Sequence, residues 1–133
     1  MNEKTKEDYL RAIYHHQEEK QQISIGSTDI CKYLNLSKST VSEMLKKLMK
    51  EKLIQRSSYE KIRLTKKGLL KSIEVTKKHR IIEVFLSKIL RISPALVHIE
   101  AHKLEHAFSK ESITSIARII KNAKTCPHGK PIP

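Results

Sequence analysis

The chain has little of what long loops, disulfide frameworks or membrane spans require. Its 133 residues include three glycines, four prolines, two cysteines and no tryptophan. So few turn-forming residues leave little room for low-complexity linkers. No apolar run approaches the roughly 20 residues of a transmembrane helix, and the polar N-terminus is unlike a signal peptide. Two cysteines without a Cys-x-x-Cys pattern favour a reduced, cytoplasmic protein.

Acidic residues are also scarce, because 14 Asp and Glu stand against 27 Lys and Arg, for a formal net charge of +13. Such a balance favours a polyanionic partner, either nucleic acid or an anionic membrane surface. The basic residues do not line one long amphipathic helix with aromatic anchors, which argues against a membrane. With 38% hydrophobic residues, the chain can form one globular domain or two small ones.

The front half of the chain has the pattern of a winged helix-turn-helix. Capping and apolar periodicity predict a helix that begins near Thr5, a second opened by Ser27, and a third that begins at Ser37 or Lys38. Two short strands, 54–56 and 62–64, surround a polar tip at 57–61 and would form the wing. Residues 23–25 are a further strand candidate.

Basic residues concentrate between Ser37 and Lys71, where 11 Lys and Arg against three Glu give +8 of the total +13. The first residues of a recognition helix are the ones that reach base edges in the major groove. Here they are Ser37, Lys38, Ser39, Thr40, Ser42 and Glu43. Lys46, Lys47 and Arg63 are interpreted as phosphate contacts. For any single lysine, a solvated helix face is the alternative.

The back half reads as helices only. A long helix is predicted from about 66 to 90 with Thr65 as its cap, another from Pro94 to Phe108, and a last one from Ser109 to about 122. Their apolar surface exceeds what so short a segment can bury alone, which favours a homodimer. We therefore expect a mainly α protein: a winged helix-turn-helix DNA-binding domain over 1–70, followed by an all-helical metal-binding and dimerisation domain over 71–133.

Histidines and carboxylates gather in this back half at helical spacing. Four side chains fall at i, i+4, i+7 and i+8, on one side of a helix. They are His98, His102, Glu105 and His106. Upstream, His79 and Glu83 form a second i, i+4 pair. Imidazoles and carboxylates without a thiolate favour Mn(II) or Fe(II) over cysteine-rich structural zinc.

Each of these donors also has a simpler interpretation. A single surface histidine is more often solvated than ligating, and Glu83 could instead pair with a Lys or Arg. Glu100 is a further candidate within the cluster. Three histidines lack such partners and are interpreted as solvated: His15, His16 and His128. Cys31 is interpreted as a small core residue and Cys126 as an exposed one.

Several stretches, spread over almost the whole chain, carry a family resemblance. They are Asp8–Tyr14, Leu36–Met44, Leu64–Gly68, Lys78–Arg80, Val97–His106 and Cys126–Pro133. In this combination and order the chain resembles the metal-dependent repressors of the diphtheria toxin repressor family, which includes iron-dependent regulators and the manganese transport regulator.

The resemblance implies a winged helix joined to a helical dimerisation domain that holds two metal ions per subunit. The first implied set of ligands is His79, Glu83 and His98, and the second is Asp8, His102, Glu105 and His106. Bound metal would position the first helix and the two winged helices, so that a homodimer fits a palindromic operator and represses metal-uptake genes. From the residues alone, Asp8 is an acid that complements the helix dipole.

Three departures from the family pattern matter, and the first two of them concern the metal. His102 stands where many relatives carry Cys or Glu, and Asp8 stands where the iron-type relatives carry a thioether. Both Fe(II) and Mn(II) therefore remain candidates, and such donors can also hold Zn(II), Co(II) or Ni(II) in vitro. The chain also stops at Pro133, where longer relatives continue into an SH3-like third domain, so we expect either a two-domain member or a truncated chain.

Two other functions compete with a metal-activated repressor of metal-ion homeostasis genes. One is a metal-independent winged-helix regulator whose histidines serve packing. The other is a metallohydrolase that uses the same donors. The sequence has no nucleophile elbow, no phosphate-binding glycine loop and no His-Glu-x-x-His motif. We therefore expect a DNA-binding protein and not an enzyme.

Overall fold

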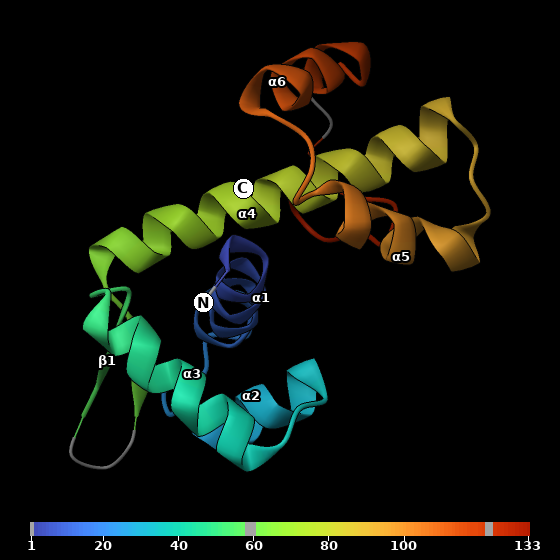
Figure 1. Cartoon of the computed structure of the whole chain (residues 1–133). Helices are drawn as coiled ribbons and strands as arrows, with labels where there is room; N and C mark the ends of the chain where they lie inside the picture. Colours follow the sequence, from blue (N-terminus) through green and yellow to red (C-terminus); the bar gives the residue numbers. More distant parts are fainter. Residues whose placement is uncertain (1, 58–60, 122–123) are drawn as a thin grey trace. The chain divides into compact units, whose positions relative to one another are not determined.

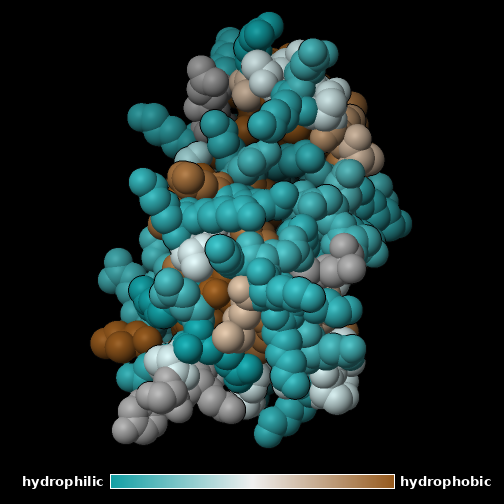
Figure 2. All heavy atoms as spheres, turned by 60° about the vertical axis from the view of Figure 1, so that its left-hand side comes forward, coloured by the Kyte–Doolittle hydropathy of each residue, from teal (hydrophilic) through white to brown (hydrophobic). Residues whose placement is uncertain are grey.

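The computed structural model describes residues 2–57, 61–121 and 124–133. The chain forms two compact units, Met1–Ile73 and Glu74–Pro133. Helix α4, Lys66–Val84, begins in the first unit and continues into the second (Figure 1). Hydrophilic side chains dominate the face of the molecule in Figure 2. Among the described residues, no helix is long and apolar enough to cross a membrane.

The first unit is a winged helix-turn-helix. Its elements are α1 (Glu3–Tyr14), a π-helical turn η1 (His15–Glu19), α2 (Ser27–Leu34), α3 (Lys38–Lys50), β1 (Ile54–Arg56), β2 (Ile62–Leu64) and the start of α4. The strands are antiparallel, with Ile54 opposite Leu64. Both strands have the predicted bounds. Part of the predicted wing tip, 58–60, lies outside the described residues.

Side-chain caps fix the helices of this unit. The Ser37 side chain accepts a hydrogen bond from the Thr40 N–H, so α3 begins where it was predicted to begin. The predicted start of α1 near Thr5 is wrong, because Asn2 caps the helix by accepting the Thr5 N–H at 2.8 Å. Between α2 and α3, Asn35 adopts a left-handed conformation with φ 55°, which ends α2 and forms the turn.

The core of the first unit collects the apolar face of each helix. Its fully buried members include Leu10, Ile13, Ile30, Val41, Leu45, Leu48 and Ile62. The strand predicted at 23–25 is wrong. Only Ile25 of that segment is buried, and its carbonyl accepts a single hydrogen bond, from the Ile62 N–H, whereas Ile23 is 82% exposed. One buried side chain and one hydrogen bond do not make a strand.

The start of α4 is fixed against the end of α3. The Thr65 hydroxyl oxygen accepts the Gly68 N–H at 3.0 Å, which confirms Thr65 as the cap. Here the helix passes so close to the preceding loop that a Cβ at Gly68 would lie 1.9 Å from the Leu53 carbonyl oxygen. Glycine is therefore required at this position by the close approach of two backbones.

The second unit consists, in its described part, of helices followed by a non-helical C-terminal segment, in which Thr125 and Pro131 form an isolated β-bridge. It contains the rest of α4, a π-helical turn η2 (Phe85–Ile89), α5 (Pro94–Leu104) and α6 (Lys110–Ile119). Ile82, Leu86, Val97 and Ala101 form its buried core. Helix α5 ends at Leu104, four residues before the predicted end at Phe108, because the chain turns at 105–107. These elements confirm the mainly α fold class, a winged helix followed by a helical domain.

Candidate metal centres and DNA-binding face

Two adjacent helices bring together His79, Glu83 and His98, hereafter the first donor set. His79 and Glu83 lie one turn apart on α4, with His79 Nε2 at 3.4 Å from Glu83 Oε1. His98, on α5, places its Nδ1 at 3.2 Å from His79 Nε2 and 3.4 Å from Glu83 Oε2. Glu83 is only 2% exposed and His79 only 4%. Three donor atoms thus converge on one point.

The carboxylate of Glu83 is ionised despite its burial. Burial alone raises its pKa, but hydrogen bonds with His79 and His98 lower it by more, and the pKa lies well below its usual range. A buried anion next to imidazole nitrogens is the electrostatic arrangement that a divalent cation requires.

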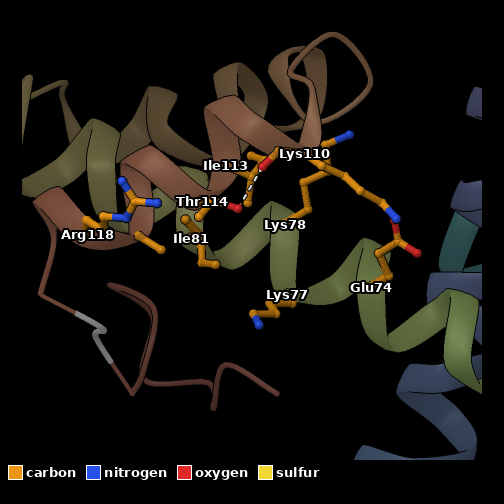
Figure 3. Close-up of a pocket in the computed structure, with 9 residues that line it drawn as sticks. Glu74, Lys77, Lys78, Ile81, Lys110, Ile113, Thr114 and Arg118 are labelled. Atoms are coloured by element: carbon orange, nitrogen blue, oxygen red, sulfur yellow. Dashed lines mark hydrogen bonds and ion pairs between the residues drawn. The ribbon is translucent and has the colours of Figure 1, made fainter.

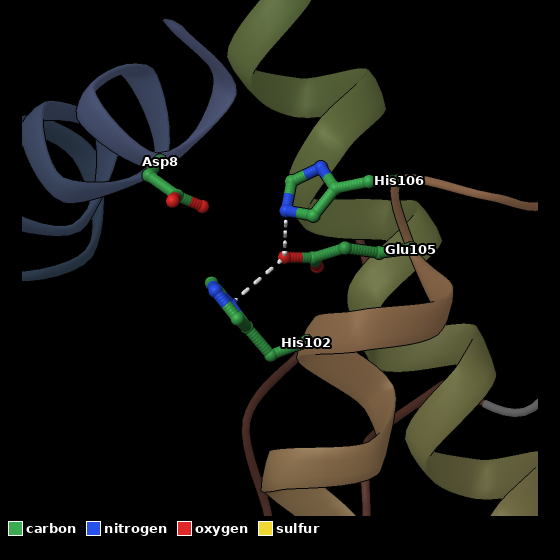
Figure 4. A group of neighbouring side chains, drawn as sticks. All are labelled: Asp8, His102, Glu105 and His106. Carbon is green, nitrogen blue, oxygen red and sulfur yellow. Dashed lines mark ion pairs between the residues drawn. The ribbon is translucent and has the colours of Figure 1, made fainter. Parts of the chain in front are cut away.

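Glu105 is the centre of a second donor set, with His102 and His106 (Figure 4). Its Oε1 lies 3.2 Å from His102 Nδ1 and 3.3 Å from His106 Nε2. Glu105 is 1% exposed. The prediction that residues 98–106 present one helical face is wrong, because α5 ends at Leu104. The turn after it carries His106 to the oxygen that His102 also approaches.

The C-terminal segment adds donors that the spacing argument missed. His128 Nδ1 lies 3.1 Å from Glu83 Oε2, and Cys126 is 4% exposed. These two residues and Glu83 form a third group whose donor atoms lie within 4.8 Å of one another. The interpretation of Cys126 as exposed is therefore wrong. The side chain of His128 is 47% exposed, as a solvated histidine would be, but it also has a carboxylate partner that the sequence did not reveal.

Backbone contacts hold this segment in place. The Cys126 N–H donates to the Lys130 carbonyl at 2.8 Å, and the Arg80 guanidinium donates to the Pro131 carbonyl at 2.6 Å. Gly129, with φ +82°, supplies the left-handed turn residue between them. The Cys-x-His spacing beside this glycine is the signal in the sequence that could have revealed this donor pair.

Four further residues were named in the sequence, two as donors and two as solvated histidines. Asp8 lies on α1, within the first unit, and is partly buried. Glu100 lies on α5 and belongs to none of the donor groups found among the described residues. His16, interpreted as solvated, is 8% exposed, and its Nδ1 lies 3.0 Å from Gln22 Oε1. His15 is half-buried beside Glu19, at 3.1 Å.

A separate hollow of about 550 Å³ lies in the second unit, lined from α4 and α6 (Figure 3). Its lining is mainly basic and aliphatic, with Lys77, Lys78, Lys110 and Arg118 around Ile81 and Ile113. Among the described residues that line it, Glu74 is the only carboxylate, and it pairs with Lys110 at 3.9 Å. Unlike the three donor groups, this described lining includes no imidazole or thiol.

The predicted DNA contacts lie together on α3. Ser37, Lys38, Ser39, Thr40, Glu43, Lys46 and Lys47 are exposed, and Ser42 is half-buried. Ser39 and Ser42 line a surface hollow of about 500 Å³ with Lys38, and Ser27 and Arg56 complete its wall. Sequence reasoning missed the last two, because α2 and the wing strand approach the start of α3 only in the folded unit. Arg63 on β2 is exposed and donates to the Gln22 carbonyl at 3.3 Å.

The chain combines a winged helix with a helical unit that carries imidazole and carboxylate donor sets. This combination is typical of proteins in which a DNA-binding fold is joined to a metal-binding domain. Two family models match the chain in turn. Residues 1–62 match the N-terminal DNA-binding domain of the iron-dependent repressors, and residues 65–133 match their metal-binding and dimerisation domain. The chain therefore belongs to the iron-dependent repressor family, which confirms the resemblance drawn from its motifs.

Individual relatives agree. The iron-dependent repressor IdeR of Mycobacterium tuberculosis is 33% identical over 129 residues, which cover 97% of this chain and 55% of IdeR. The solved structure of the manganese regulator SloR is 38% identical with a TM-score of 0.85, covering 96% of this chain and 59% of SloR. A manganese-dependent transcriptional repressor in complex with manganese gives 31% identity and a TM-score of 0.88, covering 96% and 58%. The chain spans little more than half the length of these relatives.

Proposed function

We propose that the protein is a cytoplasmic, homodimeric repressor that binds operator DNA when it holds Mn(II) or Fe(II), and that it acts by binding and not by catalysis. The observation that carries the proposal is the pair of carboxylates, Glu83 and Glu105, each nearly fully buried and each approached by imidazole nitrogens from other segments. Buried carboxylates of this kind are costly unless cations or hydrogen-bond donors compensate them.

The donor chemistry fits a first-row divalent cation. Mixed oxygen and imidazole donors suit Mn(II) and Fe(II), and a bound ion would supply the positive charge that the two carboxylates face. We assign one ion to His79, Glu83 and His98, and a second to His102, Glu105 and His106. Cys126 and His128 extend the first donor set, and their thiol and imidazole would also suit Zn(II), Co(II) or Ni(II).

Asp8 completes the second set in this proposal, which rests here on the family resemblance. A ligand on α1 would make the ion bind one form of the winged helix more tightly than others. Its binding free energy then favours the DNA-competent state, and by reciprocity DNA tightens metal binding. Controlled genes would be those of metal-ion homeostasis, and the operator would be palindromic, as a twofold dimer requires.

The exposed start of α3 supports the DNA-binding part. Short hydroxyl side chains there, such as Ser39 and Thr40, allow close approach to base edges. Lys46, Lys47 and Arg56 would contact phosphates, and these contacts provide most of the affinity and its salt dependence.

Exposed apolar residues in the second unit support the homodimer. Ile89, Leu90, Leu96 and Ile99 are 47%, 51%, 49% and 52% exposed. They lie close together in sequence, from the end of η2 to the middle of α5. Aliphatic side chains left exposed on neighbouring segments are typical of a surface that another subunit covers.

Metal titration against DNA binding tests the proposal. Fluorescent duplexes selected from a random pool by the Mn(II)-loaded protein are titrated, with anisotropy as the readout. We expect chelator to weaken binding by roughly tenfold or more, within the usual range of allosteric coupling. The double variant His79→Ala/His106→Ala should bind as the chelated protein does. DNA affinity that is unchanged by chelator and by the double substitution would favour the metal-independent regulator instead.

A further inference from the structure

Glu105 contacts both donor sets within the second unit. Its Oε1 faces His102 and His106, as described above. Its Oε2 lies 2.7 Å from Nδ1 of His79, a member of the first set. Both residues are buried, Glu105 at 1% and His79 at 4% exposure, so water competes little for this contact. One carboxylate thus offers one oxygen to each set.

The contact determines which nitrogen of His79 is available to a metal. A neutral imidazole carries one N–H, and a carboxylate at Nδ1 can only accept it. In the neutral ring the proton is therefore held on Nδ1, which leaves Nε2 to an ion. Nε2 lies 3.4 Å from Glu83 Oε1 and 3.2 Å from His98 Nδ1. Ligating histidines commonly donate their second N–H to a carboxylate, which fixes tautomer and ring orientation.

Here the orienting carboxylate itself belongs to the other donor set. An ion on Oε1 would hold the carboxylate in one orientation, and Oε2 would then hold His79 in its ligating orientation. We propose that Glu105 couples the two metal sets, so that an ion in either one raises the affinity of the other. The coupling rests on the proposed function, because both sets must bind metal. By linkage, the factor by which one ion changes the affinity for the other is the same in both directions.

Mn(II) binding by the full chain, measured through the EPR signal of the free ion, tests the coupling. His106→Ala leaves the first set and its Glu105 contact in place, while His98→Ala leaves the second set in place. We expect each variant to bind its remaining ion roughly 5- to 150-fold more weakly than the wild type does when its other set is already loaded. The factor should be the same in both variants. If His106→Ala does not fold, His102→Ala removes the other imidazole at the same oxygen.

Adding Glu105→Leu to His106→Ala isolates the orienting role. A leucine has no hydrogen-bond acceptor, so nothing in its place would hold the His79 proton on Nδ1. First-set affinity should therefore fall further, on the order of 10- to 100-fold, although Glu105 is not a donor there. Glu111→Leu, on the exposed surface of α6, is the matched control and should change nothing.

The outcomes separate the coupling from the function on which it rests. If the wild type binds two ions and each single-set variant binds its remaining ion as tightly as the wild type does, the coupling is overturned. Metal-activated DNA binding would still stand. First-set affinity unaltered by Glu105→Leu would also overturn the coupling. A wild-type protein that takes up no Mn(II) would remove the coupling and the proposed function together.

Discussion

The two units use charge in opposite ways. In the first unit, the lysines of α3 are exposed above an apolar core, so their charge remains hydrated until a partner approaches. In the second unit, Glu83 and Glu105 are 2% and 1% exposed, and histidines from three segments surround them. An exposed charge can be replaced with little effect on folding, whereas a buried one depends on its partners. Substitutions of charged residues should therefore separate folding from function in the first unit but not in the second.

Gly68→Ala should have the largest effect, because it disturbs the packing beneath the exposed lysines. The new Cβ would lie 1.9 Å from the Leu53 carbonyl oxygen, so either α4 or the preceding loop must move. We expect the free energy of unfolding to fall by about 3 kcal/mol, the upper part of the usual range for overpacking. Urea unfolding of the metal-free protein measures it.

Gly26→Ala is the control for this change. A Cβ at Gly26 would meet its nearest atom at 4.0 Å, and its φ of −106° suits any residue. Its stability should stay within about 1 kcal/mol of the wild type, the scale of a glycine-to-alanine change at a compatible site. Equal losses in the two variants would show that the close approach at Gly68 is not the cause.

In the second unit, Cys126→Ser should change metal preference and not the fold. A thiolate favours Zn(II) over the harder Mn(II), so the serine variant should lose about tenfold in Zn(II) affinity, or about 1.4 kcal/mol, with little change for Mn(II). Competition with a chromogenic chelator measures both. Cys31→Ser, in the first unit, is the matched control, and a similar zinc loss in it would count against Cys126 as a donor.

Local signals in the sequence were sufficient for most elements of the first unit. The bounds of both wing strands and the caps at Ser37 and Thr65 followed from local signals, because each depends on residues within a few positions. The prediction of a strand at 23–25 was wrong, because strand pairing there depends on a distant partner, Ile62. Gly68 shows the same limit, since its contact with Leu53 depends on how two separate segments meet.

The donor sets of the second unit were only partly predictable. The i, i+4 pair of His79 and Glu83 lies on a regular helix, so its spacing was informative. His106 approaches Glu105 through a turn and His128 approaches Glu83 from the C-terminal segment, neither of which helical spacing describes. Histidine spacing thus identified the chemistry, but the grouping of donors depended on where α5 ends.

Thr40→Ala tests base recognition by the exposed start of α3. The Thr40 hydroxyl accepts a hydrogen bond from Ser37 at 2.7 Å, and its methyl is free to contact a base. We expect a loss of about 1 kcal/mol on the preferred sequences and little loss on others, the lower part of the range for one base contact. Selection from a random duplex pool measures the altered preference, and a uniform loss across sequences would contradict a base contact.

Lys47→Ala should have the smallest effect and the opposite signature. Lys47 is exposed on α3, so its removal should leave stability unchanged. As a phosphate contact it should weaken binding to all sequences alike and lower the slope of log K against log salt by about 0.9. Anisotropy titrations at several salt concentrations measure the slope. Lys88→Ala, an exposed lysine of the second unit, is the control. A sequence-selective loss with an unchanged slope would assign Lys47 to base reading, and an equal slope change in both variants would mean only that net charge matters.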